Sequence, residues 1–358
     1  MNDPNPTYRR GRGAISNPDS RYSSTIRENF DDGWFPQERS RLTTTVTRDS
    51  ARSLLTRNDS PDIPFEQSIN AYRGCEHGCI YCFARPSHAW LGLSPGLDFE
   101  SRLFAKPEAA SLLRRELVRR NYLPKPIALG ANTDPYQPVE REWRLTREIL
   151  EVLQESRHPV SITTKSALIE RDLDLLAELA RDRLVQVQIS ITTLRRELAR
   201  QMEPRAATPD RRLQTLSRLS MAGIPVAVLV APVIPVLTDG ELESILARAA
   251  EAGAGRAGYI LLRLPLELED LFREWLFTHV PGQAEHVLSR MRDAHAGRIY
   301  RSGFGIRQTG SGPYADMIGQ RFRLALKRLR LEGEFPDLNT GLFRAPRIKT
   351  GPVQMSLF

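Results

Sequence analysis

The stretch Tyr72-Arg73-Gly74-Cys75-Glu76-His77-Gly78-Cys79-Ile80-Tyr81-Cys82-Phe83 holds all three cysteines of the 358-residue chain. Their spacing is C-x3-C-x2-C on a short, glycine-containing loop. An odd and very small number of cysteines cannot form a disulfide framework, which predicts a reducing compartment, the cytoplasm. Three thiolates this close together in such a chain predict a metal centre.

Two kinds of metal centre suit this loop. Structural zinc takes four nitrogen or sulfur ligands and would use the three cysteines together with His77. However, His77 lies between two cysteines on a tight loop, and no second ligand pair lies elsewhere in the chain. Three cysteines without a fourth suit a 4Fe-4S cluster with one iron left open to a substrate or cofactor. The 4Fe-4S cluster is favoured at this point, and zinc remains an alternative.

The composition is that of a globular protein, with 41% hydrophobic and 26% charged residues. The longest apolar stretch, 224–237, contains three prolines and is shorter than the ~20 residues that span a bilayer. The first residues do not resemble a signal peptide, and we expect no membrane association. A net charge of +8 indicates attraction to polyanions, although charge alone does not identify a nucleic acid.

The sequence divides into three parts. Residues 1–59 are basic and lack a sustained period, which predicts a mostly flexible arm that contacts nucleic acid or is simply solvated. Residues 60–332 form the predicted core with a C-terminal helical extension. The composition of residues 333–358 predicts a flexible tail.

The core alternates β-branched runs with amphipathic stretches. The predicted strands are 67–72, 126–133, 160–164, 184–192, 225–231 and 258–264. The predicted helices are 107–120, 145–155, 169–181, 210–222, 240–252 and 266–277, followed by 283–294 and 317–331. Six consecutive βα units imply a parallel sheet, either a partial barrel or doubly wound. Functional residues should then lie at the carboxyl ends of the strands.

The motif C-x3-C-x-Tyr-C after the first of six βα units resembles the radical S-adenosylmethionine (SAM) enzymes. Two further segments, Asn132-Thr133-Asp134-Pro135-Tyr136-Gln137-Pro138 and Thr163-Thr164-Lys165-Ser166, are similar to the spore photoproduct lyase-like branch, which includes uncharacterised bacterial proteins resembling DNA-repair photolyases. The resemblance implies a partial (β/α)6 barrel with Cys75, Cys79 and Cys82 as ligands of a 4Fe-4S cluster. The open iron would chelate SAM, whose reductive cleavage gives a 5′-deoxyadenosyl radical that abstracts a substrate hydrogen.

The same resemblance suggests contacts to SAM. Tyr81 would pack near the adenine, and Lys165, one of only five lysines, would balance the SAM carboxylate as a compact charge at the end of the third strand. The remaining candidates lie at other strand ends and would bind the methionine, carboxylate or ribose or line the adenine pocket: Asn132, Thr133, Ser190, Thr192 and Pro232.

The substrate is less well defined by the sequence. Spore photoproduct lyases use a further cysteine as a hydrogen donor, and this chain has none, so Tyr136 or Tyr259 would have to replace it. Arg263 and Glu267 flank the end of the sixth strand, where they would meet substrate or pair with each other. With no cysteine left for a second cluster, an external electron donor is expected. We expect a nucleic acid substrate, in DNA repair or modification.

A peptide near the end of the sequence supports DNA as the substrate. Gln354-Met355-Ser356-Leu357-Phe358 resembles the peptide by which bacterial repair proteins bind the DNA sliding clamp, with Leu357 and Phe358 for an apolar pocket and Gln354 for a polar contact. Two alternatives to a radical enzyme remain. One is a nucleic-acid-associated iron–sulfur protein with a structural or redox-sensing cluster, and the other is a zinc-stabilised barrel enzyme.

Overall fold

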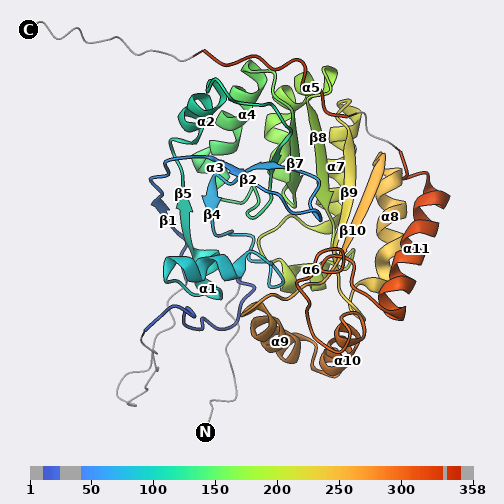
Figure 1. The fold of residues 1–358 in the computed structure, drawn as a ribbon. Helices are drawn as coiled ribbons and strands as arrows, with labels where there is room; N and C mark the ends of the chain where they lie inside the picture. Colours follow the sequence, from blue (N-terminus) through green and yellow to red (C-terminus); the bar gives the residue numbers. More distant parts are fainter. Residues whose placement is uncertain (1–10, 25–41, 334–336, 348–358) are drawn as a thin grey trace, which may run out of the picture.

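The structure is a computed structural model, which describes residues 11–24, 42–333 and 337–347. Its central sheet contains six parallel strands that lie side by side in chain order (Figure 1). They are β3 (Gln67–Ile69), β6 (Ile127–Leu129), β7 (Val160–Thr164), β8 (Val185–Ser190), β9 (Val226–Val233) and β10 (Arg256–Leu261). Strand β10 forms one edge, and the antiparallel strand β2 (Leu55–Arg57) forms the other. The predicted partial (β/α)6 barrel is confirmed, because the sheet is open and its strand order never reverses.

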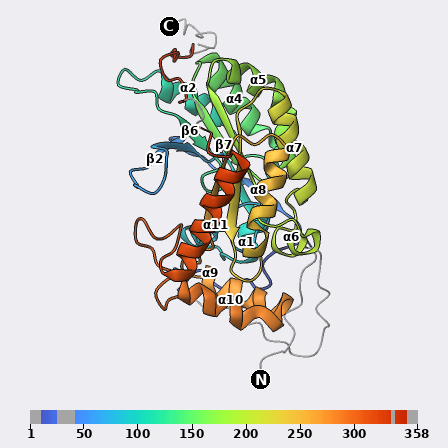
Figure 2. The ribbon, with the colours of Figure 1, turned by 90° about the vertical axis from the view of Figure 1, so that its right-hand side faces the viewer.

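Helices follow the parallel strands and return along the sheet. Figure 2 shows α4, α5, α7 and α8 on the same side of the sheet. The helices that follow successive strands are α2 (Ala109–Leu117), α4 (Leu145–Glu155), α5 (Leu173–Arg181) after the 3-10 turn η2 (Ala167–Asp172), α7 (Pro209–Met221), α8 (Leu242–Glu251) after η3 (Asp239–Glu241), and α9 (Leu268–His279).

Helix α4 illustrates why these segments are helical. Its apolar residues Leu145, Ile149 and Leu153 recur at intervals of four and are buried. Arg147 and Glu151 lie one turn apart and form an ion pair at the surface. Burying one such aliphatic side chain contributes about 1.5–3 kcal/mol. The apolar face of the helix therefore fixes its orientation on the sheet.

Two further helices extend the core, as the sequence predicts. Helix α10 (Pro281–Asp293) packs on α9, and α11 (Pro313–Leu329) packs on α8. Helix α11 also contacts the edge strand β10, where the ring centroids of Tyr259 and Phe322 are 4.7 Å apart.

A second, smaller sheet lies beside the cysteine loop. It consists of β1 (Thr45–Arg48), β5 (Arg102–Ala105) and β4 (Tyr72–Arg73), with β5 in the middle. The predicted strand 67–72 is therefore divided between the two sheets. Four short helical elements also had no counterpart in the prediction: η1 (Arg85–Leu91), α1 (Leu97–Ser101), α3 (Glu140–Trp143) and α6 (Arg196–Met202).

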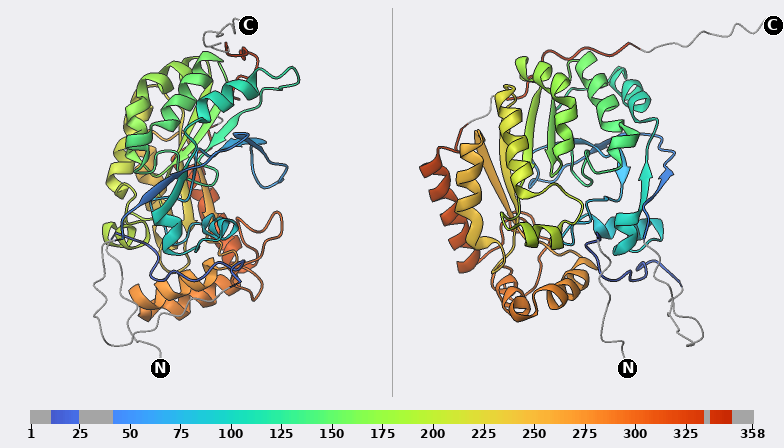
Figure 3. Two further views of the ribbon diagram at one scale, coloured as in Figure 1. Left: turned by 90° about the vertical axis from the view of Figure 1, so that its left-hand side faces the viewer. Right: turned by 180° about the vertical axis from the view of Figure 1, so that it is seen from behind.

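The prediction of a mostly flexible arm is wrong for the described parts of residues 1–59. Arg12 and Ala14 are buried, and residues 42–59 contribute β1 and β2 to the two sheets. From behind, residues 11–24 pass under α1 and beside α9 (Figure 3). Asn17 bonds to Asp98 of α1, and Ser16 donates a 2.6 Å hydrogen bond to Glu274 of α9. These long-range contacts order a segment whose polar composition suggested disorder.

The prediction of a flexible tail is likewise wrong for residues 337–347. The Phe343 ring lies 5.4 Å from the rings of both Tyr122 and His158, and the Arg344 amide donates to the Ser156 carbonyl. The clamp-like residues Gln354, Met355, Leu357 and Phe358 lie outside the described residues. None of the helices that the structure describes is long and apolar enough to cross a membrane.

Candidate iron–sulfur and SAM site

The cysteine loop leaves β4 and runs to η1, beside the carboxyl ends of the parallel strands. Cys75 and Cys79 are buried, Cys82 is half-buried, and all three are free thiols. Gly74 starts the loop with φ +75°, and a Cβ there would lie 2.7–2.8 Å from Leu103, His88 and Phe99. Only glycine fits this close, left-handed turn. The loop is therefore held tightly against the small sheet.

The thiols suit a cluster better than a single metal ion. Burial raises the pKa of Cys75, and the negative charges of Asp134, Cys79 and Cys82 raise it further, so the three thiolates need a strongly positive partner. Among the described side chains, no group of three or more Cys, His, Asp or Glu is placed to hold one metal ion. A tetrahedral zinc site would need its sulfur ligands within ~4 Å of one another. The three soft donors on one loop fit an iron–sulfur cluster.

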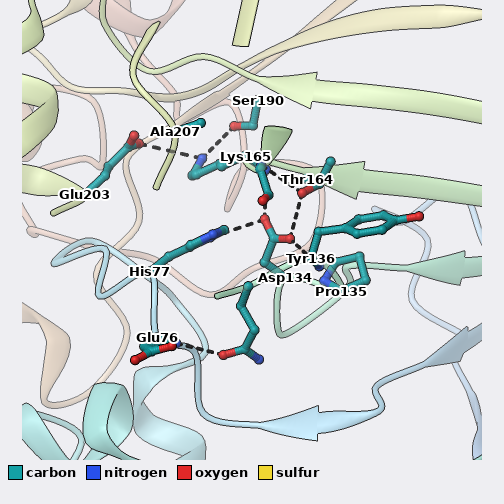
Figure 4. Close-up of polar contacts among 12 residues, drawn as sticks. Glu76, His77, Asp134, Pro135, Tyr136, Thr164, Lys165, Ser190, Glu203 and Ala207 are labelled. Atoms are coloured by element: carbon teal, nitrogen blue, oxygen red, sulfur yellow. Dashed lines mark hydrogen bonds and ion pairs between the residues drawn. The ribbon is translucent and has the colours of Figure 1, made fainter. Parts of the chain in front are cut away.

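His77, the fourth ligand of the zinc hypothesis, is paired with a carboxylate. Its Nδ1 lies 3.4 Å from Asp134 Oδ2 (Figure 4). Asp134 also accepts hydrogen bonds from Thr164 Oγ1 at 2.7 Å, the Lys165 amide at 2.8 Å and the Tyr136 amide at 2.9 Å. Burial alone would raise the pKa of Asp134, but His77 and these donors outweigh it and lower the pKa. Asp134 therefore ties the cysteine loop to the end of β7.

Lys165 lies where the sequence predicts, at the end of β7. Its Nζ donates to Ser190 Oγ at 2.6 Å and to the Ala231 carbonyl at 3.2 Å, so the ends of β7, β8 and β9 meet here. Nζ also lies 5.6 Å from the centroid of the Tyr81 ring. Burial lowers the pKa of Lys165 to about 8. Three predicted contact residues, Lys165, Ser190 and Tyr81, are thus brought together, and Pro232 follows Ala231 in β9.

A buried carboxylate, Glu203, completes this group and was missed by the sequence analysis. It follows α6 and accepts hydrogen bonds from the Tyr81 hydroxyl and, at 2.8 Å, from Thr192 Oγ1. Arg212 forms a close ion pair with it, and Lys165 Nζ is 3.8 Å away. Two cations beside one carboxylate leave a net positive charge that complements an anionic ligand. An acid in the loop after the fourth strand was the only sequence signal for Glu203.

The remaining predicted residues, Asn132, Thr133 and Tyr136, have other neighbours. Thr133 is buried and donates to the Tyr72 carbonyl at 3.2 Å, and the Asn132 amide donates to Asn70. These contacts place Thr133 beside β4 and Asn132 beside the turn that precedes it. Tyr136 lies under the guanidinium of Arg171, 5.9 Å from it, and Figure 4 shows it pointing away from His77.

Neither tyrosine proposed as a hydrogen donor faces this group. The Tyr136 side chain is fully buried behind Asp134, and burial raises its pKa well above the usual value. Tyr259 packs against Phe322 of α11 at the sheet edge. The expectation that either residue replaces the missing cysteine is therefore not supported by their positions.

Comparison with known proteins agrees with this geometry. The model of the Radical SAM superfamily matches residues 69–249, which include the cysteine loop and the ends of β6 to β9. The chain is 36% identical over 302 residues to uncharacterised proteins of Mycobacterium tuberculosis and Mycobacterium bovis, with 83% of each chain covered. An uncharacterised protein of Methanocaldococcus jannaschii is 30% identical over 48% of this chain and 62% of its own.

The chain belongs to the radical SAM superfamily, and its cofactors are a 4Fe-4S cluster and SAM. Within that superfamily its fold is of the spore photoproduct lyase type. The solved structure of spore photoproduct lyase with a dinucleoside spore photoproduct matches with a TM-score of 0.55 and 16% identity, over 79% of each chain. A double mutant of that lyase with bound AdoMet and the same dinucleoside also gives a TM-score of 0.55, at 15% identity, over 79% of this chain and 78% of its own.

Proposed function

We propose that the protein is a radical SAM enzyme whose substrate is a nucleic acid, in DNA repair or modification. When bound, the cluster would supply the electron for reductive cleavage of SAM and so the radical chemistry that removes a hydrogen from the substrate. The residues of this chain would bind and orient: Cys75, Cys79 and Cys82 hold the cluster, and Lys165 and Ser190 bind the SAM carboxylate. An external donor would deliver the electron.

The proposal of a nucleic acid is carried by Phe83, the residue directly after the third cysteine. Its side chain is 39% exposed, and the Arg263 guanidinium lies 4.0 Å from its ring centroid. An exposed aromatic ring stacks on any base, and a neighbouring arginine contacts the phosphate. The fold supports the same class, since the similar lyase was solved with a dinucleoside.

A second group of residues also combines exposed aromatic rings with an arginine. The rings of Tyr22 and Trp90 are 4.7 Å apart, and both side chains are more than half exposed. Arg21 lies over them and pairs with Glu267 at 2.5 Å. Glu267 therefore pairs with Arg21, and Arg263 stacks on Phe83. Phe83, Arg263, Arg21, Tyr22 and Trp90 form what we call the aromatic surface.

The first test separates enzyme from iron–sulfur protein. Anaerobically reconstituted protein with dithionite and SAM should form 5′-deoxyadenosine, and variants with Cys75, Cys79 or Cys82 replaced by Ser should not. A brown protein that binds a cluster but forms no 5′-deoxyadenosine would favour a structural or redox-sensing cluster. A colourless protein with stoichiometric zinc would favour the zinc-stabilised barrel.

The second test concerns the substrate class. Phe83→Ala should weaken binding of single-stranded DNA by about 10-fold, since stacking of one base contributes ~1–3 kcal/mol. Leu123→Ala is the matched control, because Leu123 is 70% exposed but precedes β6, at the amino ends of the strands. Fluorescence anisotropy with labelled single strands, duplex and RNA measures both variants. Equal binding by Phe83→Ala and wild type would exclude the aromatic surface as the nucleic acid site.

We also propose the DNA sliding clamp as a partner, through Gln354, Met355, Leu357 and Phe358. The support is the sequence likeness of this peptide, with apolar anchors beside a polar contact. Deleting residues 354–358 should abolish co-elution with the clamp and leave 5′-deoxyadenosine formation unchanged. If intact protein does not bind the clamp, this partner is excluded.

A further inference from the structure

The basic segment near the start of the chain passes directly behind the cysteine loop. Gly13 is so close to this loop that a Cβ on it would lie 1.8 Å from the carbonyl oxygen of Gly78. Arg12 is only 1% exposed and donates to the Glu100 carbonyl at 2.6 Å and to the Leu42 carbonyl at 2.9 Å. Arg12, in the part of the basic arm that the structure describes, is therefore interior and does not face solvent. We call residues 11–15 the strap.

A fully buried carboxylate joins the strap to the loop. Glu100 accepts hydrogen bonds from the Gly13 amide at 2.9 Å and from the Ala14 amide at 2.7 Å. The same carboxylate pairs with Arg85 at 2.6 Å, and neither side chain of this pair is exposed. A buried ion pair of this kind is stable only when its remaining donors and acceptors are satisfied. The strap supplies two of the hydrogen bonds that Glu100 needs.

Arg85 carries the contact on to the cysteine loop itself. It lies three residues after Cys82, and it donates to the Cys79 carbonyl at 2.9 Å and to the Gly78 carbonyl at 3.0 Å. Its other nitrogen donates to the Gly96 carbonyl at 2.8 Å. The guanidinium thus bonds to both peptide groups that flank Cys79. The position of the second cysteine depends on Arg85, and Arg85 depends on Glu100.

The strap is attached to the loop at two more points. Arg205 donates to the Gly11 carbonyl at 3.1 Å and pairs closely with Glu76, which lies between the first two cysteines. Ala14 and Ile15 pack in the same apolar cluster as Cys79, Ile80 and Tyr81. The strap therefore meets the loop and its supporting side chains through backbone hydrogen bonds and apolar side chains.

We propose that the strap is part of the iron–sulfur site, where it positions the cysteine loop and closes one side of it to solvent. This inference rests on the cluster assignment and is independent of the nucleic acid substrate. Residues that hydrogen-bond to metal ligands or hold them in place commonly lower the metal affinity by about 10- to 100-fold when they are mutated. The basic segment would then serve cluster retention, and Gly13, Glu100 and Arg85 would be positioning residues.

The test uses Gly13→Ala in the full chain, with Gly282→Ala as the matched control, because a Cβ at Gly282 would meet nothing within 4 Å. We expect Gly13→Ala to release iron to a chelator about 10-fold faster than wild type, as altered supporting groups do elsewhere. Gly282→Ala should match wild type. The rate of iron release is measured as the loss of visible absorbance, in the absence of SAM and substrate turnover. Thermal unfolding of both apoproteins by circular dichroism checks that the barrel remains folded.

Trypsin cleavage after Arg12 reports whether the strap is displaced, since Arg12 is buried in the packed state. Faster iron release together with new cleavage supports the proposal. Cleavage with unchanged iron release overturns it, because the strap is then displaced without effect on the cluster. Unchanged cleavage and unchanged release also overturn it, since the described packing leaves no room for the methyl group. If Gly13→Ala unfolds the barrel, Glu100→Gln is measured in the same way, and wild-type iron release by folded Glu100→Gln also overturns the proposal.

Discussion

Lys165 is the residue whose position is most informative for SAM binding. Its ammonium lies at the point where three strands end. Lys165 and Arg212 are the two cations beside the carboxylate of Glu203. Lys165→Met should weaken SAM binding by about 10- to 100-fold, because a hydrogen bond to a charged group contributes ~1.5–3 kcal/mol. Equilibrium dialysis of the reconstituted protein measures this. Lys125→Met is the control, since Lys125 pairs with Glu66 on the exposed surface.

The same residue predicts a pH dependence. Burial lowers the pKa of Lys165 to about 8, so the ammonium is present below pH 8 and is lost as the pH rises through that value. The affinity for SAM should therefore fall between pH 7 and 9. Lys165→Arg should bind with a flat profile over this range, because a guanidinium stays charged. A fall of equal size in both proteins would assign the titration to another group.

At the residue scale, the sequence predicted which strand-end residues meet in the site, but it did not predict the site residues that helices bring in. Lys165, Ser190 and Thr192 could be placed together because the carboxyl ends of neighbouring parallel strands share one edge. Glu203 and Arg212 could not, since Glu203 follows α6 and Arg212 belongs to α7, and they meet only after both helices have packed. Thr133 was assigned to SAM but bonds to Tyr72, because a second, unpredicted sheet begins there.

At the scale of elements, the turn after β6 depends on a single glycine. Gly130 has φ +91°, and a Cβ there would lie 2.1 Å from the carbonyl oxygen of Thr163 in β7. Gly130→Ala should lower the free energy of unfolding by at least 1–3 kcal/mol, roughly the cost of the backbone conformation alone. Urea denaturation measures the loss. Gly240→Ala, where a Cβ meets nothing within 4 Å, should stay close to wild type.

Regular elements could be predicted and short ones could not. Helix α4 has the predicted bounds, and α7 begins and ends within one residue of them, because their apolar residues repeat with helical period. Strands β1, β4 and β5 have two to four residues each and are defined by pairing between distant segments. No local pattern of that length distinguishes a strand from a loop.

For the whole molecule, composition was misleading for residues 11–24 and 337–347, which the structure describes. Polar, arginine-rich sequence predicts disorder only when its donors lack partners, and here Arg12 donates to backbone carbonyls inside the fold. Near the other end, a single aromatic residue, Phe343, anchors residues 337–347 against Tyr122 and His158. Both segments are therefore held on the core by contacts between residues far apart in the sequence.

The docked segment 337–347 makes the stability of the whole molecule sensitive to acid. His158 is fully buried, with Nδ1 3.0 Å from the Pro159 carbonyl oxygen and Nε2 2.6 Å from the Tyr122 hydroxyl. Burial lowers the pKa of His158 to about 4, well below the ~6.5 of an unfolded chain. The unfolded state therefore takes up a proton first as the pH falls. Stability is complete above pH 6.5 and declines from there to pH 4.

The shift corresponds to about 3 kcal/mol of unfolding free energy over that window. Urea denaturation of wild type at pH 7, 5.5 and 4.5 should show this decline, and His158→Gln should decline less by about that amount. Phe343→Ala should also flatten the profile, because removing the ring admits water to His158 and returns its pKa toward the unfolded value. If wild type and His158→Gln lose stability in parallel, His158 is not the group that titrates. If Phe343→Ala alone keeps the wild-type slope, the packing of residues 337–347 does not control it.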